Sequence, residues 1–388
     1  MPAKRNRETS LGEVAWLFLK LGTIAFGGPA AHIAMMEDEV VSRRKWLSRE
    51  KFLDLLGATN LIPGPNSTEM AIHVGYLRAG WPGLLVAGTC FILPATIIVL
   101  GFAWVYVRYG SLPETARVLY GVKPVIIAIV LQALWALGRT AVKTKSLAVI
   151  GIAATVFAFL RVNELLVLFA AGVAVVILHT IVSGKRSQKA KFRLFLFPIG
   201  PLAFIQAATA AGTSVGLLPL FLFFLKVGSI LFGSGYVLLA FLRADLVERW
   251  QWLTNAQLLD AVAVGQVTPG PVFTTATFIG YLVAGPKGAI VATFGIFLPA
   301  FIFVAVSGPL VPRIRRSPIA AAFLDGLIVA SLALMVVVTF ELGKVSLVDL
   351  PTIGLAVVSA LLLFRWKINS AWLVLGGALI GFLIATYR

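Results

Sequence analysis

The chain has 388 residues, of which 59% are hydrophobic and 13% are charged, and its mean hydropathy is +0.96. A soluble globular protein carries about a quarter of charged residues, so this composition excludes a soluble fold and indicates that lipid surrounds much of the chain. The formal net charge is +17, but the basic residues lie in short loops between apolar segments. That placement follows the positive-inside rule of membrane proteins and argues against a nucleic-acid partner.

Long apolar stretches recur along the chain, for example residues 84–106, 162–182 and 320–340. Each is close to the roughly 20 residues that span a bilayer as a helix. The sequence lacks the alternating pattern of a membrane β-barrel. It therefore predicts an all-α, multi-pass protein of the cell inner membrane.

The first apolar segment, residues 18–28, contains Lys20 and runs into Phe26-Gly27-Gly28-Pro29. Glycine and proline both interrupt helices, so we expect a break near the middle of the first membrane helix. We assign Gly27 and Gly28 to the lining of a substrate site. A lysine in a membrane segment either faces a cavity or extends to the interface, and both interpretations of Lys20 remain open.

The charged stretch from Glu37 to Lys45 follows, with three acidic and three basic residues. We interpret it as a solvated helix end on the cytoplasmic side, with ion pairs among its own side chains. Asp245, Glu248 and Arg249 resemble a second copy of this stretch.

Pro63-Gly64-Pro65 separates two apolar segments, residues 51–60 and 66–76, that are each too short to span a bilayer. The motif ends a helix and predicts a broken helix or a re-entrant hairpin. A helix that begins after Pro65 directs unpaired N–H groups and the positive end of its dipole into the gap, which suits an anion. The residues that we assign to this part of the substrate site are Asn60, Pro63, Gly64, Pro65, Asn66, Ser67 and Thr68.

Glu69 and His73 lie four residues apart, on one face of the helix that follows this break. A carboxylate and an imidazole can carry a proton, so we expect the pair to couple transport to protons; a buried structural pair is the alternative. The chain has three histidines, none in a metal-ligand spacing, so we expect no metal site and no cofactor.

A basic linker, residues 183–193, comes next, and an apolar stretch, residues 194–211, follows it. If this stretch spans the membrane, it is an extra helix that inverts everything after it. We therefore divide the chain into a first repeat at 1–182, a linker with an extra helix at 183–213, and a second repeat at 214–388.

The second half repeats the first, with Lys226 lying 206 positions after Lys20. The same offset aligns tryptophan, aspartate and Pro-Gly-Pro positions, which chance similarity of apolar sequence would not do. With the extra helix included, most loop lysines and arginines fall on the cytoplasmic side, so we predict inverted-topology repeats with the site at their interface. The second-half residues that we assign to the substrate site are Lys226, Gly233, Gln266, Pro269, Gly270, Pro271 and Thr274.

Taken together, these motifs resemble the chromate ion transporter family in its long-chain, two-domain form. The residues that carry the resemblance are Phe26-Gly27-Gly28-Pro29, His32, Glu39, Trp46, Pro63-Gly64-Pro65 and Gly75-Tyr76. The resemblance implies two homologous halves of opposite orientation. It also implies export of chromate driven by the membrane potential or a proton gradient, with sulfate as the natural mimic.

Three functions compete. The first is a secondary exporter of chromate, and the second is a transporter of the same fold for sulfate, another oxyanion or an organic acid. The third is a membrane-embedded enzyme, against which stands the lack of HExxH, GxSxG and Walker motifs in the sequence. We expect a transporter and not an enzyme. Its expected partners are the oxyanion and the lipid bilayer, and a homodimer is left open.

Overall fold

A computed structural model describes residues 11–26, 28–110, 112–182, 216–231, 237–315, 317–366 and 368–386, and every regular element in them is helical. The linker and extra helix that we predict at 183–213 lie outside the described residues. The first repeat contains α1 (Leu11–Ile24), α2 (Gly28–Glu37), the π-helical turn η1 (Asp38–Arg43), α3 (Arg49–Thr59), α4 (Asn66–Tyr109), α5 (Pro113–Ala141), α6 (Lys145–Phe159) and α7 (Glu164–Val182).

The second repeat contains the same order of helices, and most of them begin 205 or 206 residues after their counterparts. Its elements are α9 (Leu217–Ile230), α10 (Leu238–Phe241), η3 (Leu242–Arg249), α11 (Asn255–Val267), η4 (Val272–Thr274), α12 (Thr275–Arg315), α13 (Pro318–Ser346), α14 (Leu350–Leu361), η5 (Leu362–Trp366) and α15 (Ser370–Thr386). Within the described residues, five helices are long and apolar enough to cross a bilayer, namely α4, α5, α7, α12 and α13.

The long helix α4 is a tight hairpin of two helices that meet at Ala79 and Gly80, where the backbone leaves the helical region and Gly80 has a φ of 60°. A Cβ added at Gly75 would lie 2.3 Å from the carbonyl oxygen of Gly83, so the two arms pack backbone against backbone. Small residues permit such close packing in membranes. The second repeat has the same turn at Ala284 and Gly285. These two turns are not among those that we predict. The breaks that we predict at the two Pro-Gly-Pro motifs are confirmed, because α3 ends at Thr59 and α11 ends at Val267.

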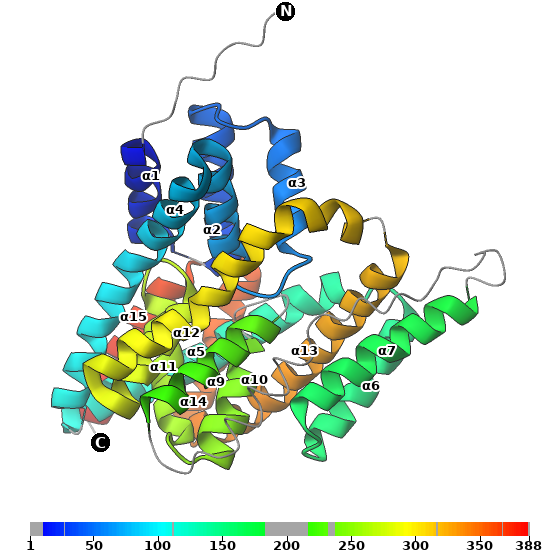
Figure 1. Ribbon diagram of the computed structural model, residues 1–388. Coiled ribbons are helices and arrows are strands. Elements are labelled where there is room, and N and C mark those ends of the chain that lie inside the picture. Colours follow the sequence, from blue (N-terminus) through cyan, green and yellow to red (C-terminus); the bar gives the residue numbers. More distant parts are fainter. Residues whose placement is uncertain are drawn as a thin grey trace, which may run out of the picture.

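The two repeats run in opposite directions. In Figure 1, the long arm of α4 descends toward the lower left, whereas the equivalent arm of α12 rises from the lower left toward the upper right. η1 and α3 accordingly lie at the upper end of the molecule, and the α6–α7 turn lies at the lower end. The predicted inverted repeats are confirmed.

The repeats also exchange their last helices, because α5 packs against α14 and α15 of the second repeat, whereas α13 packs against α6 and α7 of the first. Glycine makes both crossings close: a Cβ at Gly121 would lie 2.0 Å from the carbonyl oxygen of Gly377. The equivalent pair is Gly326 and Gly172, where a Cβ at Gly326 would lie 2.7 Å from the Cα of its neighbour. The crossings of α5 with α15 and of α13 with α7 therefore join the two repeats.

Candidate functional site at the two Pro-Gly-Pro breaks

Each Pro-Gly-Pro motif forms the turn of a hairpin, the first between α3 and α4 and the second between α11 and η4. The central glycines have positive φ angles, 137° at Gly64 and 91° at Gly270. Side chains with a Cβ rarely adopt such angles, so the turn requires glycine at both positions. The flanking prolines, Pro63, Pro65, Pro269 and Pro271, keep the turn from continuing as a helix.

Reciprocal hydrogen bonds join the two breaks. The Gly64 N–H donates to the carbonyl oxygen of Leu231 at 2.8 Å, and the Gly270 N–H donates to the carbonyl oxygen of Ala25 at 2.9 Å. Ala25 and Leu231 directly follow α1 and α9, so each break contacts the first helix of the other repeat. Both turns therefore lie at the interface of the repeats.

Polar side chains gather around the first break. The Asn66 side-chain amide donates to Asn60 Oδ1 at 2.7 Å. His32 is buried, with Nε2 at 3.0 Å from the Ala25 carbonyl oxygen and Nδ1 at 3.4 Å from Ser67 Oγ. Thr68 Oγ1 is buried and has no hydrogen-bond partner among the described residues. This end of α4 thus presents the unpartnered hydroxyl of Thr68 close to the turn.

Glu69 is fully buried, and neither of its carboxylate oxygens has a hydrogen-bond partner among the described residues. It lies against the turn, because a Cβ at Gly64 would be 2.3 Å from Glu69 Oε1. His73 Nε2 is buried and unpartnered in the same part of the chain, so no hydrogen bond links the two side chains. A charged, unpaired carboxylate is costly in such a position, whereas a protonated one is much less so.

The second break differs, because its hydroxyl groups are already satisfied. Thr274 Oγ1 donates to the Pro271 carbonyl oxygen and Thr275 Oγ1 donates to the Val272 carbonyl oxygen, both at 2.8 Å. Gln266, one residue before the end of α11, is buried. The unused polar atoms of this region therefore lie mainly on the first-repeat side.

The two membrane lysines are held by equivalent carboxylates 19 residues later. Lys20 Nζ lies 2.8 Å from Glu39 Oε1, and the buried Lys226 pairs with the buried Asp245. The hydrogen bond from Lys20 lowers the pKa of Glu39 below its ordinary value. Each lysine thus meets a negative charge within its own repeat, and its role in binding an anion stays a prediction.

The ion pairs that we predict within the stretch from Glu37 to Lys45 are confirmed, because Arg43 pairs with Asp38 and Arg44 pairs with Glu39. The interpretation of the whole stretch as solvated is wrong for Glu39. Glu39 is buried, as is Asp245 in the second repeat. The π-helical turns η1 and η3 carry these carboxylates, and the sequence pattern of helices does not reveal that they face inward. The sequence signal for this pairing is that each carboxylate follows the lysine of its own repeat by 19 residues.

A second polar cluster escaped the sequence reasoning. Asp260 on α11 is buried, accepts a hydrogen bond from the Tyr106 hydroxyl at 2.9 Å, and lies 3.4 Å from Lys123 Nζ. Asp54, its equivalent on α3, is exposed. An aspartate within an apolar stretch was the signal for it. Of the other predicted residues, Gly28 is the first residue of α2, and Gly27 and Gly233 lie outside the described residues.

Comparison with known proteins identifies one family. The sequence model described as "Chromate transporter" matches residues 12–176 and 218–382. A chromate transport protein of Cupriavidus metallidurans is 34% identical over 96% of this chain and 92% of its own length. A probable chromate transport protein of Synechococcus elongatus is 32% identical over 93% and 91%, respectively. No solved structure matches the chain.

Proposed function

Because the chain belongs to the chromate transporter family, we propose that it exports chromate, a tetrahedral oxyanion, across the cell inner membrane. The observation that carries this proposal is the pair of hydrogen bonds that join each Pro-Gly-Pro turn to the end of the first helix of the other repeat. Each turn thus lies against the other repeat, and the interface of inverted repeats is where transporters of this architecture bind their substrates. The relatives are named as transport proteins, so we propose transport and not catalysis.

The anion would bind between the breaks through uncharged donors. The first turn of α4, and η4 ahead of α12, offer N–H groups and the positive ends of two helix dipoles, and Thr68 and Asn66 add side-chain donors. Such donors recognise charge and shape more than the central element of the oxyanion. Sulfate is therefore the second substrate that this site would accept.

Glu69 would give this site its proton dependence. Its carboxyl group lies against the first turn without a partner, so a negative charge on it would repel an incoming anion. When it is protonated, its O–H can donate a hydrogen bond to an anion oxygen. One proton would then accompany one dianion, and a single net negative charge would move. A membrane potential that is negative inside favours outward movement by about 2.3 kcal/mol per charge per 100 mV.

Flux of labelled chromate in inside-out membrane vesicles tests the proposal. Uptake into these vesicles corresponds to export from the cell, so we expect an imposed potential, positive inside the vesicle, to drive it. Sulfate should compete, and a pH gradient imposed separately should change the rate. Equal chromate flux in vesicles with and without the protein would refute the proposal, and preferred flux of sulfate would change the substrate but not the site.

A further inference from the structure

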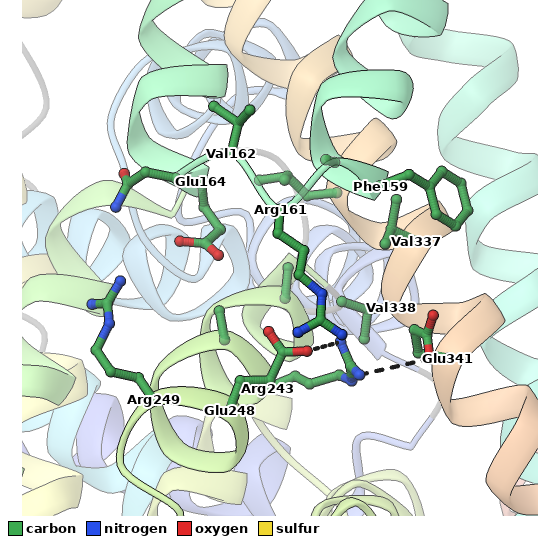
Figure 2. Close-up of a pocket in the computed structure, with 15 residues that line it drawn as sticks. Phe159, Arg161, Val162, Glu164, Arg243, Glu248, Arg249, Val337, Val338 and Glu341 are labelled. Carbon is green, nitrogen blue, oxygen red and sulfur yellow. Dashed lines mark ion pairs between the residues drawn. The ribbon is translucent and has the colours of Figure 1, made fainter.

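A polar cavity of about 380 Å³ lies away from the Pro-Gly-Pro turns, none of whose residues line it. Its walls are the turn between α6 and α7 in the first repeat, and α10, η3 and α13 in the second. Figure 2 shows side chains from both repeats pointing into it. The cavity is therefore a second place where the two repeats meet.

Three arginines line the cavity, and they differ in the ion pairs that they make. Arg243 is engaged: NH1 lies 2.8 Å from Glu248 Oε1, and NH2 lies 3.7 Å from Glu341 Oε2. Arg161 has no ion-pair partner among the described residues, adopts a left-handed φ of 59°, and points toward the Arg243–Glu248 pair (Figure 2). Its five N–H donors are thus free to bind a ligand.

The third arginine connects the cavity to the buried lysine. Arg249 NH1 lies 2.6 Å from Asp245 Oδ1, and Asp245 also pairs with Lys226. The first repeat has an equivalent arginine, Arg43, in this position. At the position of Arg243, however, the first repeat has Glu37, which is paired with the exposed Arg49. At the cavity, the second repeat thus has a guanidinium group where the first repeat has a carboxylate.

The cavity is lined by three arginines and three glutamates, so its formal charge is balanced, and Arg161 is the lining arginine without an ion pair among the described residues. Glu248 and Glu341 contact Arg243, and Lys344 adds a second cation 3.3 Å from Glu341. Glu164 also lines the cavity and has no ion pair among the described residues, so it opposes a bound anion. An anion would therefore bind weakly here, as expected of a site that the substrate occupies only briefly during transport.

We propose that this cavity is a second binding site for tetrahedral oxyanions, at the outer mouth of the transport path. The inference rests on the proposed function for its substrate class. In the predicted topology, Arg161, Arg243 and Arg249 all lie on the non-cytoplasmic side, where basic residues are disfavoured. Their convergence on one cavity therefore needs a reason other than membrane insertion. Guanidinium groups bind tetrahedral oxyanions through paired, charge-assisted hydrogen bonds.

Cysteine protection tests the site. Ala244 is a small residue that lines the cavity, and Ala244→Cys in a Cys90→Ser background provides a single thiol in the intact protein. In proteoliposomes, a membrane-impermeant maleimide added from the outer side should label it. Sulfate is the probe, because chromate oxidises thiols. We expect sulfate to slow labelling, and chloride at matched ionic strength to have no such effect.

Variants identify the ligand. Arg161→Gln should raise the sulfate concentration for half protection about tenfold, the equivalent of one charge-assisted hydrogen bond. Arg108→Gln is the control, because Arg108 is exposed at the end of α4 and does not line the cavity. If Ala244→Cys does not fold, Val337→Cys on the α13 wall serves the same purpose.

Three results would overturn the site: equal effects of sulfate and chloride, unchanged protection in Arg161→Gln, or labelling only from the cytoplasmic side. Protection that disappears in Glu69→Gln but persists in Arg161→Gln would place the anion at the breaks and would also overturn it. Chromate flux measured on the same preparations separates the two proposals. Flux without protection contradicts only the outer site, and protection without flux contradicts only the transport function.

Discussion

At the scale of single residues, the fully buried Glu69 combines a titratable group with two unpartnered oxygens. We predict that Glu69→Gln, which keeps the shape and removes the charge, flattens the pH dependence of chromate flux while sulfate still binds. Flux in vesicles across a range of pH is the measurement. Glu50→Gln, at an exposed position on α3, is the control. A Glu69→Gln profile that matches the parent would make the carboxyl group structural.

Variants of Lys226 and Asp245 can distinguish a structural role of Lys226 from a role in binding the anion. Lys226→Met should lower thermal stability, but by less than the roughly 3–5 kcal/mol that a fully uncompensated buried charge costs, because Asp245 keeps its ion pair with Arg249. Adding Asp245→Asn should restore part of this loss, since the partner that Arg249 then loses can be replaced by water at its half-exposed side chain. If the lysine also binds the anion, the stable double variant will bind sulfate weakly. Parent-like sulfate binding by the double variant would confine Lys226 to a structural role.

The pair of Lys20 and Glu39 is less buried than that of Lys226 and Asp245, and it predicts a dependence of stability on pH. Because the pKa of Glu39 is lowered in the folded protein, its contact with Lys20 stabilises the fold at pH values above the ordinary carboxylate range. That contribution is lost as the pH falls through the lowered pKa. Thermal melts between pH 3 and 7 should therefore show a steeper acid decline in the parent than in Glu39→Gln. Parallel curves would contradict the contribution of this pair.

At the scale of helices, the glycine crossings make a direct prediction. Gly326 on α13 contacts the backbone of α7, whereas Gly343 on the same helix has no atom within 4 Å of an added Cβ. Gly326→Leu should force α13 away from α7 and destabilise the protein by about 1–3 kcal/mol or more. Gly343→Leu should change stability little. Equal melting temperatures of the two variants in detergent would show that the crossing is not close.

The breaks and repeats could be predicted from the sequence because their causes are local. Proline and positive-φ glycine stop a helix whatever surrounds it, so Pro63-Gly64-Pro65 fixes a turn by itself. The exchange of α14–α15 and α6–α7 could not be predicted, since apolar side chains look alike whether they face lipid or protein. The same limit applies to Glu39 and Arg243. Their partners depend on which surfaces of η1 and η3 face inward, and a π-helical turn shifts that register.

At the scale of the whole molecule, the opposite directions of the repeats can be measured. Lys51 on α3 and Lys287 after the turn of α12 are both exposed. In a Cys90→Ser background, Lys51→Cys should react with an impermeant maleimide from the cytoplasmic side and Lys287→Cys from the other side. Labelling of both positions from one side would contradict the inverted arrangement in the membrane.

The exchange of helices between the repeats has a consequence for biosynthesis. α5 is synthesised more than 200 residues before α14 and α15, against which it packs. The first repeat must therefore remain in the bilayer with a Gly-lined face open to lipid until translation of the second is complete. Synthesis of α14 and α15, and not insertion of the first repeat, would then be the event that closes the fold, and a chain truncated before them would expose that face to quality-control proteases.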